Sequence, residues 1–395
     1  MAKAIRDDAL DIVSQWHRDM DMGALIGDRL SEGLASGSVD LVALGKASRE
    51  MASAAARFLG ERVQRRLIIS EEYRDGDARD VLVGDHPIPG ERSLRAGRAL
   101  LDFLSAPTSA STTLFLVSGG ASSLCSVPAP PLTLADLRDM WDATVATGFN
   151  ITELNTLRAA TSVLSGGAVL RSVRTPTSLG VVLVDNVISG APWVASGLTY
   201  EHLIGGPVLE ELLERAELTT SVLARQLREA THARELLMCQ PVTTEHRNVV
   251  LAEPSSVLEI TLAAAQRRGY RVVDLGSRID MEVAEATARW SQALVEALHT
   301  REPTCVVGVG EVIVRLRGAG LGGRCQEFAW SMMPVLASLD REATFVATST
   351  DGRDFVDRVA GAYATSDSLE RAMALGVDWA QVANRNDTYH GHLAL

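Results

Sequence analysis

The sequence contains few cysteines, and their spacing excludes the common cysteine-based sites. The four cysteines lie far apart in the 395 residues, and no two of them form a Cys-x-x-Cys pair; they are Cys125, Cys239, Cys305 and Cys325. Structural zinc and dithiol redox centres need closely spaced thiols. We therefore expect no structural zinc and a reducing compartment.

Long apolar runs and basic clusters are also missing. No apolar stretch approaches the roughly 18 residues needed to cross a bilayer, and the first residues lack the apolar core of a signal peptide. The net charge is −12 without any basic stripe, which disfavours a nucleic-acid partner. These absences predict a cytoplasmic protein that binds neither membranes nor nucleic acids.

Apolar segments typical of strands alternate with helical segments along the chain. Strands are expected at residues 39–44, 66–70, 113–117, 180–184, 248–251, 270–274, 312–317 and 344–347, and helices at 48–59, 132–147, 155–173, 255–268 and 328–336. This alternation is typical of α/β proteins with parallel sheets. Because 395 residues are too many for one ordinary core, we expect two domains, residues 1–240 and 241–395.

The glycine-rich segment 318–327 joins a predicted strand to a predicted helix. Such a backbone lets amide N–H groups approach an anion, and Arg324 adds a guanidinium suited to phosphate or carboxylate. Gly318, Gly320 and Gly323 also have the spacing of a dinucleotide-binding loop, although few residues follow for the second half of such a fold. An anion site, a nicotinamide site and a structural glycine turn are the three interpretations.

Polar residues also follow predicted strands in the first half of the chain, where ligands bind to open α/β sheets. Lys46 follows the first strand and either stabilises a transferring phosphoryl group or is a solvated lysine at a helix start. Gly119 and Gly120 lie within residues 118–123, which also contain three serines and predict a cradle for an oxyanion. A serine nucleophile is disfavoured because the flanking glycines of a nucleophile elbow are missing.

Two aspartates and one histidine have both a chemical and a structural interpretation. Asp185 and Asp351 follow predicted strands, where a carboxylate can bind Mg²⁺, accept a proton or cap a turn. His86 lies in a proline-rich turn, where it either contacts a substrate or supports the turn.

Taken together, these segments resemble the glycerate 2-kinase family whose C-terminal domain is called MOFRL. The matching segments include Leu-Gly-Lys-Ala at 44–47, Asp-His-Pro-Ile-Pro at 85–89, Ser-Gly-Gly-Ala-Ser-Ser at 118–123 and Gly-Gly-Arg-Cys-Gln-Glu at 322–327, and they cover nearly the whole chain in order. The resemblance implies two three-layer α/β/α domains, a Rossmann-like N-terminal one and a MOFRL-like C-terminal one, with the active site in a cleft between them.

The resemblance further implies ATP- and Mg²⁺-dependent phosphoryl transfer to the 2-hydroxyl of glycerate or a related small hydroxy acid. Lys46, Arg324 and Asp185 then correspond to the catalytic residues, and Asp185 and Asp351 to the metal ligands. The residues that would bind substrate or phosphate are Ser118, Gly119, Gly120, Ser122, Asn155, Arg158, Gly322, Gly323 and Glu327. The expected partners are a hydroxy acid and a nucleotide, and the resemblance allows a homodimer.

Several positions depart from the family pattern and support other hypotheses. Ser165 stands where lysine is usual, and Ala159 and Ala160 where basic residues are usual. The family's usual terminal segment is expected beyond Leu395, where this sequence ends. The first alternative is a catalytically silent relative that binds a phosphorylated metabolite or a partner. The second is an NAD(P)-dependent hydroxypyruvate reductase, suggested by the glycine spacing alone.

Overall fold

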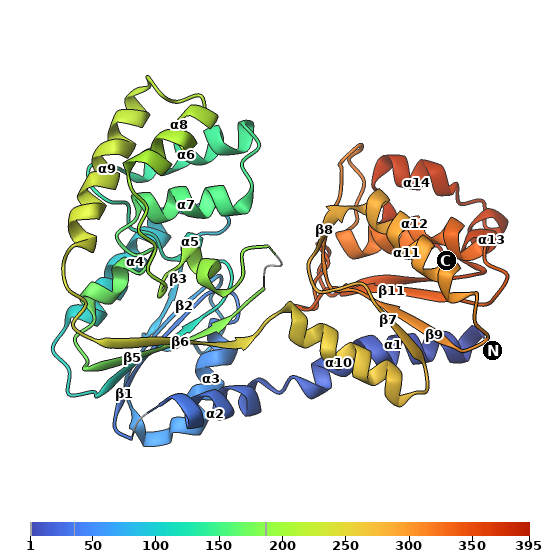
Figure 1. Cartoon of the computed structure of the whole chain (residues 1–395), viewed down its shortest axis with the longest axis horizontal. Helices are drawn as coiled ribbons and strands as arrows, with labels where there is room; N and C mark the ends of the chain where they lie inside the picture. Colours follow the sequence, from blue (N-terminus) through green and yellow to red (C-terminus); the bar gives the residue numbers. More distant parts are fainter. Residues whose placement is uncertain (1, 35, 186–187) are drawn as a thin grey trace. The chain divides into compact units, whose positions relative to one another are not determined.

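The computed structural model describes residues 2–34, 36–185 and 188–395. These residues form two compact units, Asp21–Glu253 and the pair of segments Met1–Met20 and Pro254–Leu395. Each unit has its own strands and helices (Figure 1) and its own apolar core. In the described residues no helix is both long enough and apolar enough to cross a membrane.

The unit Asp21–Glu253 is built around one sheet. Its strands are β1 (Val39–Leu44), β2 (Val63–Ser70), β3 (Val81–Val83), β4 (Thr112–Val117), β5 (Thr177–Leu183) and β6 (Glu245–Ala252). Its helices are α2 (Met22–Gly33), α3 (Ser48–Leu59), α4 (Glu91–Ser105), α5 (Ala121–Leu124), α6 (Leu134–Ala146), α7 (Ile151–Thr161), α8 (Gly206–Arg215) and α9 (Val222–Met238), with 3₁₀ turns η1 (Gly60–Arg62), η2 (Ala168–Ser172) and η3 (Ala191–Ser196).

The six strands are all parallel and lie in the order β3-β2-β1-β4-β5-β6. This is the order of a Rossmann-like sheet, in which the connections reverse direction between β1 and β4. Ligands bind such sheets at the carboxyl ends of the strands, beside this reversal. The α/β fold class and the Rossmann-like character are therefore confirmed.

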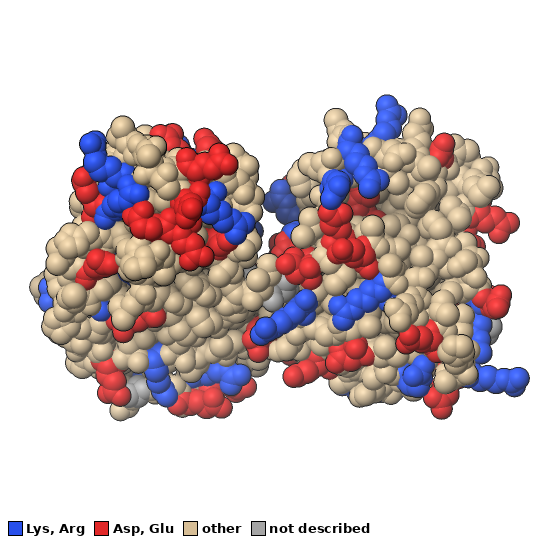
Figure 2. Space-filling model, turned by 45° about the horizontal axis from the view of Figure 1, so that its top comes forward, with Lys and Arg blue, Asp and Glu red and all other residues tan. Residues whose placement is uncertain are grey.

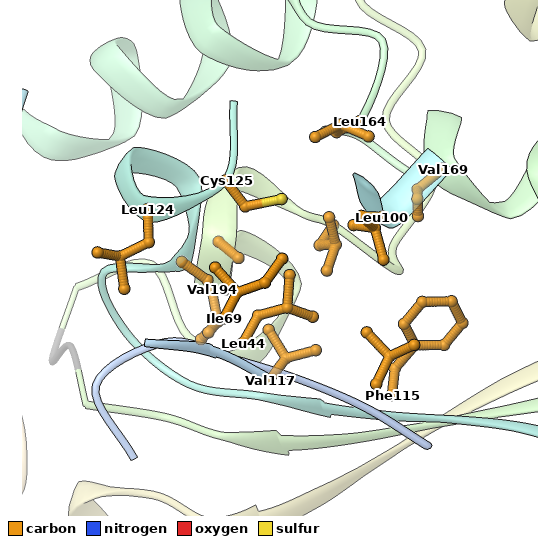
Figure 3. Close-up of a cluster of buried hydrophobic side chains, with 14 of the residues drawn as sticks. Leu44, Ile69, Leu100, Phe115, Val117, Leu124, Cys125, Leu164, Val169 and Val194 are labelled. Atoms are coloured by element: carbon orange, nitrogen blue, oxygen red, sulfur yellow. The ribbon is translucent and has the colours of Figure 1, made fainter. Parts of the chain in front are cut away.

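Apolar side chains pack on both faces of this sheet. On one face, Ile26 and Leu30 of α2 and Met51 of α3 are fully buried against the strands. On the other face, Leu100 of α4 and Leu124 of α5 pack with the strands in a second cluster (Figure 3). The unit therefore has the expected three α/β/α layers, and both faces of the strands are buried, as is usual for parallel sheets.

Both chain ends contribute to the other unit, which contains short sheets. Its strands are β7 (Arg271–Asp274), β8 (Ile279–Glu282), β9 (Thr304–Val307), β10 (Gly310–Ile313), β11 (Thr344–Thr348) and β12 (Gly361–Thr365), paired as β7–β9 and β8–β10 in parallel and β11–β12 antiparallel. Its helices are α1 (Ala2–Asp19), α10 (Pro254–Arg267), α11 (Val283–Ala297), α12 (Arg324–Ala337), α13 (Ser368–Ala374), α14 (Trp379–Arg385) and α15 (Thr388–Leu393). The longest of these helices, α1, packs on α10 and β11.

The predicted domain boundary near residue 240 differs from the observed one. Strand β6 pairs in parallel with β5 and completes the first sheet, so the chain leaves that unit only after Glu253. Residues 1–20 were also predicted in the first domain but belong to the other unit. Apolar patterning marks the elements, whereas it does not show which sheet a strand joins or which unit a helix packs on.

The predicted helix at 155–173 is wrong, because α7 ends at Thr161 and a 3₁₀ turn begins only at Ala168. Gly166 and Gly167 between them have φ values of 59° and 77°, a conformation that an α-helix does not contain. The helix predicted at 132–147 corresponds to α6, and Thr133 and Asp136 form a capping box at its start.

Acidic and basic side chains are intermingled on the molecular surface in view in Figure 2. Because the net charge is −12 and the basic side chains in view are mixed with acidic ones, an anionic ligand must be held by cations and amide groups that lie close to it.

Candidate functional site

The carboxyl ends of the parallel strands bring the candidate residues of the first unit together. Lys46 follows β1, Glu71 follows β2, and His86 lies three residues after β3. Residues 118–122 follow β4, and Asp185 follows β5. Because all these strands run in the same direction, the five segments emerge at one edge of the sheet.

The turn after β1 is tied directly to the turn after β4. Gly45 has a φ of 111°, and a Cβ atom there would lie 2.3 Å from the Ser118 hydroxyl oxygen. The amide of Ala47 donates to this hydroxyl (3.1 Å), which itself donates to the carbonyl of Leu44 (3.2 Å). Ser118 was predicted to bind substrate or phosphate, but its buried hydroxyl instead joins the two turns.

The turn after β4 presents a row of amide groups. The backbone N–H groups of Gly119, Gly120, Ala121 and Ser122 have no hydrogen-bond acceptor among the described residues. Gly120 has a φ of 81° and opens the single-turn helix α5. Consecutive amides in such a left-handed turn form a concave site that favours anions. This geometry supports the predicted oxyanion cradle.

Two other groups contact the glycines of this turn. A Cβ atom on Gly119 would fall 1.5 Å from the Oδ2 atom of Asp185, so the carboxylate lies directly against the Gly119 backbone. A Cβ atom on Gly120 would lie 3.4 Å from both the His86 ring and the Cγ atom of Lys46. The glycines therefore allow Lys46, His86 and Asp185 to approach the cradle closely.

Arg158 of α7 supplies a second cation beside this turn. Its guanidinium donates to the Ser122 hydroxyl (3.4 Å) and stacks over the ring of Trp141, with 5.0 Å from Cζ to the ring centroid. Burial lowers the pKa of Arg158 to about 10, and no carboxylate of the described residues offsets this effect. A desolvated cation without a counter-charge is costly, so Arg158 is suited to bind an anionic ligand.

We expect Arg158→Met to weaken the binding of ATP or inorganic phosphate at least about tenfold, because a charge-assisted hydrogen bond is lost. The melting temperature of the ligand-free variant should equal or exceed that of the unmodified protein, because the change removes a desolvated charge that has no acidic partner among the described residues. Thermal unfolding with and without ligand measures both effects. Arg92→Met is the matched control, since Arg92 pairs with Asp85 at the surface (2.6 Å). A ligand-free melting temperature well below that of the unmodified protein would contradict the assignment.

Lys46 is one of only two lysines in the sequence, the other being Lys3. Arginine supplies every other basic side chain apart from the histidines. The Lys46 side chain is exposed at the edge of the cradle, and its backbone amide donates to the Gly119 carbonyl (3.0 Å). A flexible ammonium group is a compact point charge that can follow a transferring phosphoryl group.

Asn155 was predicted to bind substrate and has another role in the structure. Its side chain is buried, and its Oδ1 atom accepts a hydrogen bond from the Ser196 hydroxyl (3.0 Å). Ser196 has a φ of 51°, so Asn155 fixes a strained position at the end of η3.

The glycine-rich segment in the other unit is filled by the chain itself. The amides of Arg317 and Gly318 donate to Oδ1 of Asn386 (2.6 and 3.1 Å), and the amide of Leu321 donates to Asp387 (3.0 Å). A Cβ atom on Gly320 would lie 2.5 Å from the Arg385 carbonyl oxygen. The structure therefore supports the structural-turn interpretation, because these glycines allow the C-terminal residues to pack closely.

The helix start after this segment is also occupied. The amides of Cys325 and Gln326 donate to the carboxylate of Asp354 (3.0 and 2.9 Å), which is buried. A Cβ atom on Gly323 would lie 2.4 Å from a carboxylate oxygen of Asp354, and one on Gly322 would lie 2.2 Å from the Thr388 hydroxyl. The prediction of an anion cradle at the start of α12 is therefore corrected, since the protein supplies its own carboxylate there.

The remaining predicted residues of this unit have internal partners. Arg324 forms an ion pair with Glu311 of β10. Glu327 is buried, which raises the pKa of its carboxyl group, and it accepts a hydrogen bond from Asn386 (2.7 Å). Asp351 accepts from the amide of Arg353 (3.0 Å) within its own turn.

Neither a metal cluster nor a nicotinamide motif emerges from these positions. Among the described residues, no three His, Cys, Asp or Glu side chains form a group that could hold a metal ion. The glycine spacing of a dinucleotide loop lies after the short strand β10, whereas the Rossmann-like sheet belongs to the other unit. The glycine spacing is thus outside the context in which it would indicate nucleotide binding.

The chain matches two family models and several relatives with assigned names. Residues 9–230 match a domain of unknown function (DUF4147), and residues 304–395 match the MOFRL family. D-glycerate 2-kinase of Thermotoga maritima is 26% identical over 89% of this chain and 84% of its own length. Glycerate kinase of Homo sapiens is 28% identical over 88% of this chain and 78% of its own length. A putative hydroxypyruvate reductase of Agrobacterium vitis is 28% identical over 80% of this chain and 72% of its own length.

A solved structure has the same fold. The crystal structure of glycerate kinase from Thermotoga maritima superposes with a TM-score of 0.86 at 24% identity, covering 99% of this chain and 94% of that one. The DUF4147 match spans more than half of the chain, and the MOFRL match follows it. The chain therefore belongs to the DUF4147 family and, with its C-terminal MOFRL domain, is a member of the glycerate 2-kinase family.

Proposed function

We propose that the protein is a kinase that transfers the γ-phosphoryl group of ATP to a hydroxyl of glycerate or a related small hydroxy acid. The observation that carries the proposal is the row of amides at residues 119–122, beside which lie Lys46 and Arg158, an arginine with no acidic partner in the described part of the chain. Phosphoryl transfer depends mainly on positioning and charge stabilisation. Both substrates of such a reaction are anions, which agrees with two cations and one amide cradle at one sheet edge.

The cations have different tasks in this proposal. Arg158, held in place by Trp141 and Ser122, has a planar fork suited to bind a carboxylate or phosphate in a fixed orientation. Lys46, on an exposed flexible stem, stabilises the charge of the moving phosphoryl group. Arg324 is proposed as a further phosphoryl-stabilising cation, which requires that it exchange Glu311 for the ligand.

Asp185 is the residue that best fits Mg²⁺. Magnesium is usually bound by one or two carboxylates together with substrate phosphates and water. The Asp185 carboxylate lies against Gly119 at the start of the amide row, so its donor chemistry and place suit a metal-bound phosphate. The ion would neutralise phosphate charge there. Asp351 is a second candidate ligand from the family resemblance alone.

The presence of only two lysines allows a direct test of the site. We expect an amine-reactive ATP derivative, such as an acyl phosphate, to acylate Lys46 and not Lys3, and excess ATP should suppress the reaction at Lys46. Peptide mass spectrometry measures the labelling of both residues, with Lys3 as the internal control. Equal labelling of both lysines without competition by ATP would contradict the proposal.

Turnover is the decisive measurement for the reaction itself. ATP, Mg²⁺ and a panel of hydroxy acids should give a phosphorylated acid detectable by ³¹P NMR. The alternative is a silent relative, favoured by the fully buried Ala159 and Ala160, which leave Arg158 as the sole cation of this part of α7. That alternative predicts thermal stabilisation by ATP or phosphate without turnover.

A further inference from the structure

His86 and Glu71 form a pair that the proposed roles leave unused. His86 follows β3, and Glu71 directly follows β2, the neighbouring strand in the sheet. The Nδ1 atom of His86 lies 3.5 Å from Oε1 of Glu71. The carboxylate is half exposed, whereas the imidazole is largely covered, with 22% of its side chain accessible. An acidic side chain therefore lies beside the Nδ1 side of the ring.

The Nε2 side of the ring lies against Gly120, one residue of the amide row. The Nε2 and Cδ2 atoms both lie 3.4 Å from the position that a Cβ atom of Gly120 would occupy, as does the Cγ atom of Lys46. Among the described residues, Nε2 has no hydrogen-bond partner. If Nδ1 carries the proton, Nε2 carries the lone pair and lies beside Gly120 of the amide row.

Burial is the main factor that lowers the pKa of His86 and so favours its neutral imidazole. Burial and the positive charges of Lys46 and Arg158 lower its pKa, while Glu71 and Asp185 raise it. The combined effect places the pKa of His86 below its ordinary value. A neutral imidazole is able to accept a proton, whereas a protonated one is not.

We propose that His86 is the proton acceptor of the phosphoryl transfer and that Glu71 is its positioning residue. The inference rests on the kinase function proposed above. In the step, the hydroxyl oxygen of the acid forms a bond to the γ-phosphorus, and the bond from that phosphorus to the β–γ bridging oxygen breaks. The hydroxyl proton moves to Nε2 of His86, ADP leaves with the electron pair, and the imidazolium releases the proton to water.

This assignment gives metal binding to Asp185 and proton acceptance to His86, two tasks that the Asp185 carboxylate alone could otherwise perform. Asp185 is exposed and lies on Gly119, where it suits a metal ion, and a carboxylate engaged with a cation is a poor base. His86 lies instead against Gly120, beside Lys46. The proton acceptor and the phosphate-binding groups would then surround the same short row of amides.

The test is the pH dependence of kcat/KM for the acid substrate in the full-length protein. We expect the rate to fall as pH decreases through the pKa of His86, because the protonated ring cannot accept the hydroxyl proton. His86→Gln should lower kcat about 10²-fold, the lower end for general base catalysis, with little change in KM for ATP. This variant should also lose the acid limb of the profile. Imidazole added to His86→Ala should restore part of the rate.

Glu71→Gln and Asp185→Asn complete the test. Because Glu71 raises the pKa of His86, Glu71→Gln should shift the acid limb to lower pH, and its exposed position preserves the fold. Asp185→Asn should lower kcat but retain the acid limb of the pH profile. The inference is overturned if the kcat of His86→Gln is within threefold of the original value, or if this variant retains the acid limb of the pH profile. Either result leaves the kinase function in place. Absence of turnover in the unmodified protein overturns both.

Discussion

Replacement of Lys46 by alanine is expected to lower kcat about 10³-fold, a typical loss for a cation that stabilises a transferring phosphoryl group. The unfolding midpoint should not change, because the side chain is exposed and only its backbone amide joins the turn after β4. Steady-state kinetics with ATP and a hydroxy acid, together with thermal unfolding, measure the two quantities. Lys3→Ala, in α1, is the matched control and should behave like the unmodified protein.

Lys46→Arg distinguishes charge from shape at the same position. Arginine retains the positive charge but replaces a compact ammonium by a planar fork. If Lys46 acts on the moving phosphoryl group, the kcat of Lys46→Arg should lie between that of Lys46→Ala and that of the unmodified protein. ATP turnover that persists unchanged in Lys46→Ala would remove Lys46 from the proposed mechanism.

Asp354→Ala is expected to have the largest effect on stability, a loss of about 3 kcal/mol in the free energy of unfolding. The buried carboxylate accepts from the amides of Cys325 and Gln326 at the start of α12 and from the Gln326 side chain (3.1 Å). Alanine would leave the amides of Cys325 and Gln326 without this acceptor and would remove a negative charge from the helix start, whereas the Gln326 side chain would keep its hydrogen bond to the carbonyl of residue 354 (3.0 Å).

Urea unfolding followed by tryptophan fluorescence measures this loss, since Trp290, Trp330 and Trp379 belong to the same unit as α12. The midpoint of the fluorescence transition should fall while its slope is unchanged. Asp351→Ala is the control in the same loop; Asp351 is exposed, and the expected change is within about 0.5 kcal/mol. Equal midpoints for the two variants would show that Asp354 does not hold the helix start.

The layers and most strands of the first unit could be predicted because buried parallel strands are continuous apolar runs. The predicted strands at 39–44 and 113–117 correspond to β1 and β4 within one residue. Strand β3 was missed because it has only three residues, too few for a periodic pattern. The long helix predicted from 155 failed at two adjacent glycines, whose positive φ values a single sequence does not reveal.

The candidate site could be predicted in part. Their positions after predicted strands indicated Lys46, Asp185 and the amide row as site residues, and the structure places all three together. The role of Ser118 could not be foreseen, since its hydroxyl bonds to residues more than seventy positions away. The glycine-rich segment 318–327 was a persuasive local pattern, but the groups that fill it come from Asp354 and the C-terminal residues. Local sequence cannot distinguish a ligand's carboxylate from one that the chain supplies itself.

The packing of α1 has a consequence for how the protein is made. Ile12 of α1 is buried against Ala264 and Ala265 of α10, and Asp8 accepts a hydrogen bond from Tyr270 (2.9 Å). The ribosome therefore completes α1 long before the surface that covers it exists, while the intervening sheet can fold as a unit. During this interval an apolar helix face at the N-terminus stays open to chaperones and to other nascent chains. A solubility tag fused at that end would protect a surface whose natural cover, α10, is synthesised more than 200 residues later.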